Sequence, residues 1–201
     1  MPNWCNNIAT LTHSDSTLID KIEQADWVLQ ALIPCPEELN DNELTTSYGD
    51  EEKQKVVEAK KAAMKAKYGF PSWYEWNIAN WGTKWDLCDV TKTRIDANTI
   101  QLSFESAWSP PVEAYDRLLG MDFEIQAFYH EPGMGFAGVY DNGNDDCYSD
   151  WGDSQGARDT LPKELDEMFA ISEQQEERER EEKEELQLWI EDGVKAREAA
   201  E

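Results

Sequence analysis

The chain has 201 residues, of which 40% are hydrophobic and nine are Trp, enough apolar side chain for one packed domain of about 150 residues and an extension. Its 43 Asp and Glu residues outnumber 18 Lys and Arg, and the resulting net charge of −25 argues against direct binding to a nucleic-acid backbone. The charge is uneven, since residues 143–201 hold 20 acidic and 7 basic residues. Such an acidic surface suits docking onto a basic partner surface.

The four cysteines are scattered, and the chain has only two histidines. Zinc sites usually pair closely spaced Cys or His ligands, and no CxxC motif occurs here. We therefore predict buried thiols, with no metal and no cofactor. The residues concerned are Cys5, Cys35, Cys88, Cys147, His13 and His130.

Residues 1–4 show neither the basic region nor the apolar core of a secretory signal, and no apolar run reaches the length of a membrane span. We expect a cytoplasmic protein that does not associate with membranes, with its cysteines reduced.

The first predicted strand covers Cys5–Thr12, and Ser14–Ser16 then provides capping oxygens for a short amphipathic helix. The apolar run Trp27–Ile33 is short enough for a second strand, although a helix end fits it as well. Residues Asn40–Tyr48 are polar and predict a loop.

Two helices are expected next. Asp50–Tyr68 is rich in Glu, Lys and Ala and ends at Gly69, a typical helix terminator. A further helix begins at Pro71–Ser72 and continues through Asn80. Together these segments predict a helical insertion at about residues 50–80.

The periodicity then becomes that of strands. Trp85–Arg94 and Thr99–Glu105 alternate and are joined by a turn, which predicts a hairpin. Ser109–Pro111 begins a helix that runs to Leu119, with serines expected at its N-cap.

Two alternating strands follow at Phe123–Tyr129 and Phe136–Tyr140. Asp141–Asp146 reads as an Asx-rich turn, with a calcium loop as the less favoured alternative because the EF-hand spacing is missing. Cys147–Trp151 is a candidate edge strand.

Without the insertion, this order approximates βαββαβ. We therefore predict an α+β domain at residues 1–155, with a ferredoxin-like (split βαβ) antiparallel sheet and helices on one face. Residues 161–201 predict a separate acidic C-terminal helix, whose apolar residues return only from Leu186 onward. A solvated or frayed tail is the alternative for this segment.

Four segments resemble the YubB-like proteins of plasmids and bacteriophages. They are MPNWCNN at residues 1–7, WYEWNIANWGTKWD at residues 73–86, FESAWSPP at residues 104–111, and the aromatic–glycine stretch at residues 128–140. The resemblance covers roughly residues 1–150. It implies a ferredoxin-like fold and an origin on a mobile element, and it supplies no activity and no catalytic residue.

The motif WGTKWD at Trp81–Asp86 is the leading candidate for a binding site. Lys84 is one of few basic residues, and it could hold an anionic ligand beside the aromatic walls of Trp81 or Trp108. The alternative is a structural turn in which Lys84 pairs with Asp86 or Glu105. The complete set of predicted ligand- or partner-binding residues is Asn3, Trp4, Trp81, Lys84, Trp85 and Trp108.

No catalytic residue is predicted. The serines near Trp108 have no His close in sequence and no nucleophile elbow. An exposed secondary amine at Pro2, formed if Met1 were removed, is a less favoured alternative to a simple lead into the first strand.

The sequence favours a non-catalytic phage or plasmid accessory protein. Its predicted partner is a host or defence protein with a basic surface, and DNA mimicry or counter-defence would fit the acidity. The alternative is a small-molecule or nucleotide-binding domain, or an enzyme, with a Trp-lined cleft. Single-strand binding on an aromatic sheet face is least favoured, because the charge opposes it.

Overall fold

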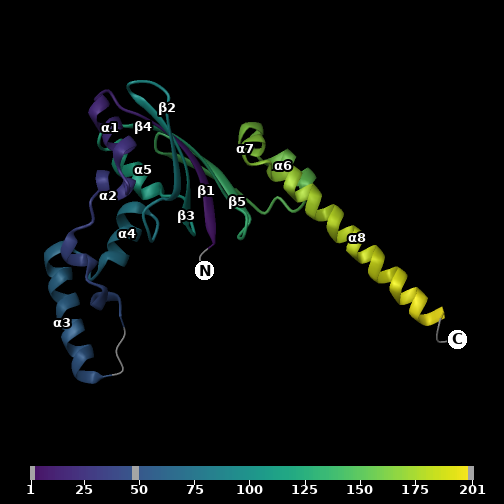
Figure 1. Ribbon diagram of the computed structural model, residues 1–201, viewed down its shortest axis with the longest axis horizontal. Helices are drawn as coiled ribbons and strands as arrows, with labels where there is room; N and C mark the ends of the chain where they lie inside the picture. The colour runs from purple at the N-terminus through teal and green to yellow at the C-terminus, as the bar shows by residue number, and fades with distance from the viewer. Residues whose placement is uncertain (1–2, 47–49, 199–201) are drawn as a thin grey trace. The chain divides into compact units, whose positions relative to one another are not determined.

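Figure 1 presents the computed structural model, which describes residues 3–46 and 50–198, with side chains up to Asp192. The chain divides into two compact units between Cys147 and Tyr148. The sequence places the end of the first domain at residue 155. α6 (Ser154–Thr160) contacts α8 (Ile171–Glu198) and lies in the second unit.

A six-stranded sheet with the order β2-β3-β1-β4-β5-β6 organises the first unit. β1 pairs antiparallel with β3 and β4, and β3 pairs antiparallel with β2. The order of the first four strands, with β1 and β3 central, is that of a split βαβ fold, which confirms the predicted α+β class. The strands are β1 (Trp4–Thr12), β2 (Cys88–Arg94), β3 (Thr99–Ala107), β4 (Glu124–Glu131), β5 (Phe136–Asp141) and β6 (Asn144–Ser149).

The core lies between one face of this sheet and the helices that cover it (Figure 1). Along β1 every second side chain is buried, from Cys5 to Leu11, because successive residues of a strand point to opposite faces. Ile19 and Tyr115 pack onto the same core from the helical layer. The helices of this unit are α1 (Ser16–Gln24), α2 (Val28–Leu32), α3 (Glu51–Tyr68), α4 (Trp73–Trp81) and α5 (Val112–Leu119).

The helical insertion is confirmed, since α3 and α4 lie between α2 and β2. Asp50 caps α3 by accepting the backbone N–H of Glu52 and Lys53, and Gly69 ends it with a left-handed φ of 82°. Both ends of α3 therefore follow from local sequence chemistry.

The predicted strand at Trp27–Ile33 is wrong, because these residues form α2. A short apolar run does not distinguish strand from helix, and the decision here comes from a distant residue. The carboxylate of Asp86 accepts the backbone N–H of Leu29 and Gln30 and so caps the helix.

The loop predicted at Asn40–Tyr48 is also more ordered than expected. Two single 3₁₀ turns, η1 (Glu37–Asn40) and η2 (Asn42–Thr45), bury Leu39 and Leu44. Residues 47–49 lie outside the described part of the chain.

The turn predicted at Asp141–Asp146 is shorter than expected. β6 already begins at Asn144, because Asn142 and Gly143 alone make the turn, with φ of 46° and 95°. Two consecutive positive φ values are typical of a tight two-residue hairpin.

No serine caps α5, since its N-cap is Pro111 and makes no side-chain bond.

The second unit consists of α6, α7 (Lys163–Phe169) and α8. Ser154 donates its backbone N–H and its hydroxyl to Glu179 at 2.7 and 3.1 Å, and Arg158 forms an ion pair with Glu176. These bonds fasten α6 to the first half of α8. The described residues include no helix that is both long and apolar enough to cross a membrane.

Candidate functional site

The WGTKWD turn connects α4 to β2, and most of its side chains point inward. Trp81 is buried and donates its indole N–H to the carbonyl of Ile33 at 2.9 Å. Its ring packs edge-on against Trp76, with centroids 5.7 Å apart. Trp81 thus belongs to the core and presents no wall to a ligand.

Gly82 and Thr83 fix the path of this turn. Gly82 ends α4 with φ of 75°, a conformation that side-chain-bearing residues rarely adopt. Thr83 Oγ1 accepts the N–H of Ala107 and donates to its carbonyl, both at 3.2 Å. Asn77 donates its amide to the carbonyl of Lys84 at 2.9 Å, so the backbone that carries Lys84 is held in place.

Asp86 ends the motif as a buried carboxylate that is only 7% exposed. It accepts the backbone N–H of Leu29, Gln30 and Leu87 at 2.7–3.0 Å. Burial raises the pKa of this carboxyl, and the three N–H donors act in the opposite direction. The expected pairing of Lys84 with Asp86 is therefore wrong, because backbone donors occupy the carboxylate.

Lys84 and Trp85 are the two motif residues whose side chains face outward. The Lys84 ammonium lies 4.7 Å from the ring centroid of Trp85 and 5.8 Å from that of Tyr74, within range of cation–π attraction. Trp85 also lies beside Trp4, with centroids 6.1 Å apart. We call Trp4, Tyr74, Lys84 and Trp85 the aromatic platform.

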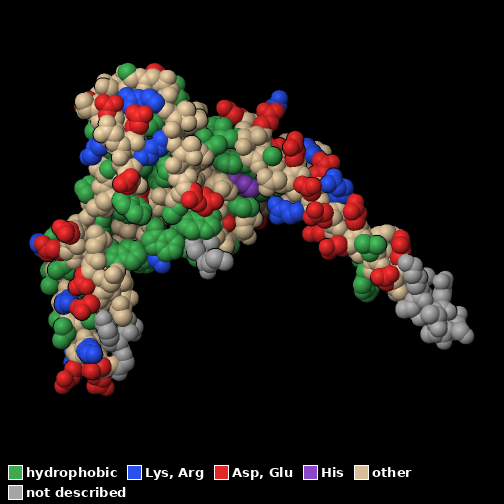
Figure 2. Space-filling model, viewed as in Figure 1, with side chains coloured by type: hydrophobic (Ala, Val, Ile, Leu, Met, Phe, Trp, Pro, Cys, Tyr) green, Lys and Arg blue, Asp and Glu red, His purple; other side chains and the backbone are tan. Residues whose placement is uncertain are grey.

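Hydrophobic side chains gather on the surface where α4 and the start of β1 lie (Figure 2). Tyr74 and Trp85 are 43% and 38% exposed, and Ile78 of α4 is also exposed. Exposed clusters of this kind commonly mark binding surfaces.

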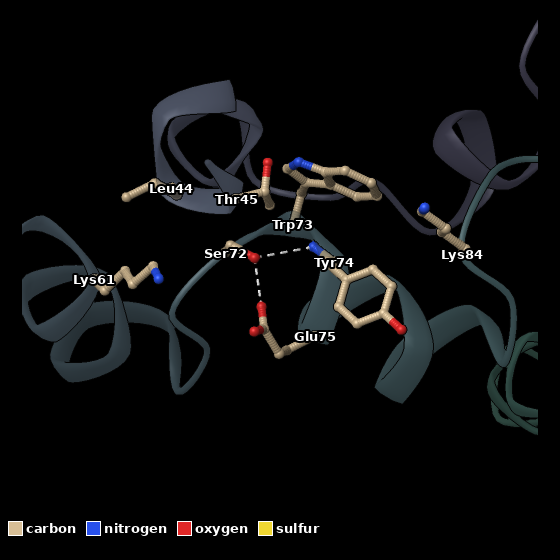
Figure 3. Close-up of a pocket in the computed structure, with 8 residues that line it drawn as sticks. All are labelled: Leu44, Thr45, Lys61, Ser72, Trp73, Tyr74, Glu75 and Lys84. Carbon is tan, nitrogen blue, oxygen red and sulfur yellow. Dashed lines mark hydrogen bonds between the residues drawn. The ribbon is translucent and has the colours of Figure 1, made fainter. Parts of the chain in front are cut away.

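A cavity of about 410 Å³ borders the platform (Figure 3). Lys61 of α3 and Lys84 lie on opposite sides of it, and Trp73 and Tyr74 of α4 lie between them. Ser72 is the N-cap of α4, since its hydroxyl oxygen accepts the backbone N–H of Tyr74 at 3.2 Å, and it donates its hydroxyl to Glu75. The lining residues are Leu44, Thr45, Lys61, Ser72, Trp73, Tyr74, Glu75 and Lys84.

Asn3 and Trp108 meet through their backbones, since Trp108 donates its N–H to the carbonyl of Asn3 at 3.0 Å. Trp108 has φ of 74° and a half-exposed side chain. No ring contact between Trp108 and the platform occurs among the described residues.

The structure thus unites three of the six predicted residues, Trp4, Lys84 and Trp85, in one surface. Sequence reasoning missed Lys61 and Tyr74, which complete the cavity and the platform. Tyr74 lies within the motif WYEWNIANWGTKWD and was detectable there, whereas Lys61 is one of several lysines of α3 and carries no local signal.

A second candidate surface is the acidic helix α8. Ten carboxylates and three basic side chains lie between residues 171 and 192. Glu181, Glu182, Glu184 and Glu185 are exposed and form no hydrogen bond or ion pair with any side chain that the structure describes.

Apolar side chains follow directly on the same helix. Leu186, Trp189 and Ile190 are spaced i, i+3 and i+4 and are 57%, 74% and 45% exposed. A run of charged side chains is thus followed by apolar side chains along the exposed part of α8, a helix whose 28 residues span about 42 Å.

Neither a protein-family model nor a curated protein matches the chain. Among solved structures, it is similar to the crystal structure of protein api92 from Yersinia pseudotuberculosis, which is described under the family model DUF1281. The two chains are 12% identical with a TM-score of 0.42, and the match covers 75% of this chain and 98% of the other. A likeness this distant carries no argument about the site.

Proposed function

We propose that this protein is a non-catalytic accessory protein of a phage or plasmid that binds a host or defence protein through α8. The carrying observation is the run of exposed, unpaired carboxylates at residues 181–185, followed by exposed Leu186, Trp189 and Ile190. The mobile-element origin rests on the resemblance to YubB-like proteins, and it places the protein in the cytoplasm of the host cell.

The chemistry of α8 defines the partner. Its carboxylates match a basic surface, and such complementarity speeds association and sets orientation. Trp189 and its apolar neighbours supply the desolvated contact that most often carries binding energy. A basic groove that otherwise holds nucleic acid meets both requirements, so the helix would act there as a DNA mimic.

Among the residues that the structure describes, no group of three or more His, Cys, Asp or Glu side chains is arranged to hold a metal ion. The two buried carboxylates of the first unit, Asp86 and Glu131, accept backbone N–H groups.

The test compares two variants that lose four negative charges each. One carries Glu→Gln at residues 181, 182, 184 and 185 of α8. The control carries amides at four exposed carboxylates of the first unit, Asp26, Glu51, Glu52 and Glu124. Affinity capture from host lysate at low salt should recover a protein with the native chain and the control, and recover much less with the α8 variant.

The captured protein is then tested for displacement. It should elute as salt rises, and double-stranded DNA should compete with the native chain for it. Equal capture by the α8 variant and the control, or capture that DNA leaves unchanged, would contradict the proposed role.

A further inference from the structure

The Lys84 ammonium has no carboxylate partner among the described residues. Two lysines of the neighbouring α3 do have such a partner, since Lys61 pairs with Glu58 at 3.3 Å and Lys67 with Glu38 at 2.7 Å. Lys84 instead lies over two exposed rings, at the edge of a cavity.

The position of Lys84 is set by the fold. Asn77 holds its carbonyl, while Thr83 and Asp86 anchor the residues on both sides through buried hydrogen bonds. The turn therefore presents the ammonium at a defined place, and little ordering of the backbone is needed when a ligand binds.

The charges that face the cavity favour a single anionic group. Lys61 and Lys84 contribute two positive charges and Glu75 one negative charge, and Glu75 already accepts the hydroxyl of Ser72. Glu58 pairs with Lys61 at 3.3 Å, whereas no carboxylate of the described residues pairs with Lys84, so an incoming anion would lie on Lys84.

The aromatic lining selects the rest of the ligand. Trp73 and Tyr74 line the cavity, and Trp85 extends the platform beyond it. Flat rings offer stacking area to another ring, and a volume of about 410 Å³ lies in the usual range for small-ligand sites.

We infer that this cavity binds a small aromatic anion, in which a ring carries a phosphate or carboxylate group. The anion lies on Lys84, and the ring stacks on the platform. The site is independent of α8, so either proposal can fail without the other.

Isothermal titration calorimetry with the full chain tests this inference. The probes are phenyl phosphate, benzoate and AMP, with inorganic phosphate as the anion alone and benzyl alcohol as the ring alone. We expect measurable binding of at least one aromatic anion and weaker binding of both partial probes. Phenyl phosphate against benzoate then distinguishes a phosphate from a carboxylate ligand.

Lys84→Gln should weaken binding about tenfold or more, because a charged hydrogen bond contributes roughly 1.5–3 kcal/mol. Lys84→Arg should retain most of the affinity. Lys65→Gln is the matched control, since Lys65 is an exposed lysine of α3 outside the cavity lining, and its loss changes the net charge equally.

Tyr74→Ala should weaken the aromatic probes while leaving inorganic phosphate unchanged. Far-UV circular dichroism checks that each variant is folded. The inference is overturned if no aromatic anion binds the native chain, or if Lys84→Gln and Lys65→Gln bind the probes equally.

Discussion

The first unit and α8 hold their structure in opposite ways. In the first unit, residues far apart in sequence fix each other, as when Asp86 caps α2 or Trp81 binds the carbonyl of Ile33. From residue 180 to Asp192, every side chain of α8 is exposed, and hydrogen bonding is local, as when Gln187 donates to Glu191 one turn further on. A substitution of a buried residue in the first unit should therefore change the stability of that unit, whereas a substitution from residue 180 onward in α8 should leave it unchanged.

The thiols give the largest expected contrast. Cys5 is fully buried, and burial next to Glu131 raises its pKa from 9.0 to about 12. At about pH 8 the thiolate fraction of Cys5 is therefore about a thousandfold smaller than that of a thiol with the ordinary pKa of 9.0. Labelling of Cys5 should be far slower than labelling of the exposed Cys147. Thiol labelling followed by mass spectrometry of the separate cysteines measures this.

The same shift sets a pH dependence. Folding favours the protonated thiol of Cys5. The stability that this thiol contributes is therefore complete below about pH 9 and is lost as the pH rises toward 12. Rapid labelling of Cys5 in the folded protein would contradict the burial of β1.

Trp81→Ala should be the most destabilising substitution considered. It removes a buried ring and its bond to Ile33, and such changes cost about 3–5 kcal/mol of unfolding free energy. Trp189→Ala in α8 is the matched control and should stay within about 0.5 kcal/mol, because Trp189 is exposed. Chemical denaturation measures both, and equal effects would break the comparison.

Asp86→Ala should cost about 1–3 kcal/mol, because it leaves the N–H groups of Leu29 and Gln30 without their acceptor. Asp86→Asn keeps one acceptor oxygen and should cost less. The exposed Asp26→Ala is the control and should be nearly neutral. A neutral Asp86→Ala would mean that α2 forms without its distant cap.

The smallest effect is expected within α8. Glu182→Gly should destabilise this part of α8 by about 1 kcal/mol relative to Glu182→Ala and so lower its helicity, since glycine is a poor helix former. Far-UV circular dichroism should detect the loss, while the thermal midpoint of the first unit stays unchanged. A lower midpoint would show that the two units are energetically coupled.

Much of the fold could be predicted from local patterns. Alternation along β1 and β3, the Glu-, Lys- and Ala-rich composition of Asp50–Tyr68 and the Gly69 terminator predicted their elements correctly. The candidate site was predicted only in part. WGTKWD identified the right segment, but alternation and composition do not tell which Trp faces inward, so Trp81 was assigned to a ligand wall that it does not form.

The sequence by itself determined the acidity of the chain and the α+β class, because these depend on composition and on short-range periodicity. Tertiary structure decided that the apolar run Trp27–Ile33 contains helix α2 and that the Asp86 carboxylate accepts the backbone N–H groups of that helix. It also decided that Lys84 lies beside aromatic rings without a carboxylate partner among the described residues. The first two outcomes depend on groups more than 50 residues apart in sequence, and no local pattern records which distant donor will be within reach.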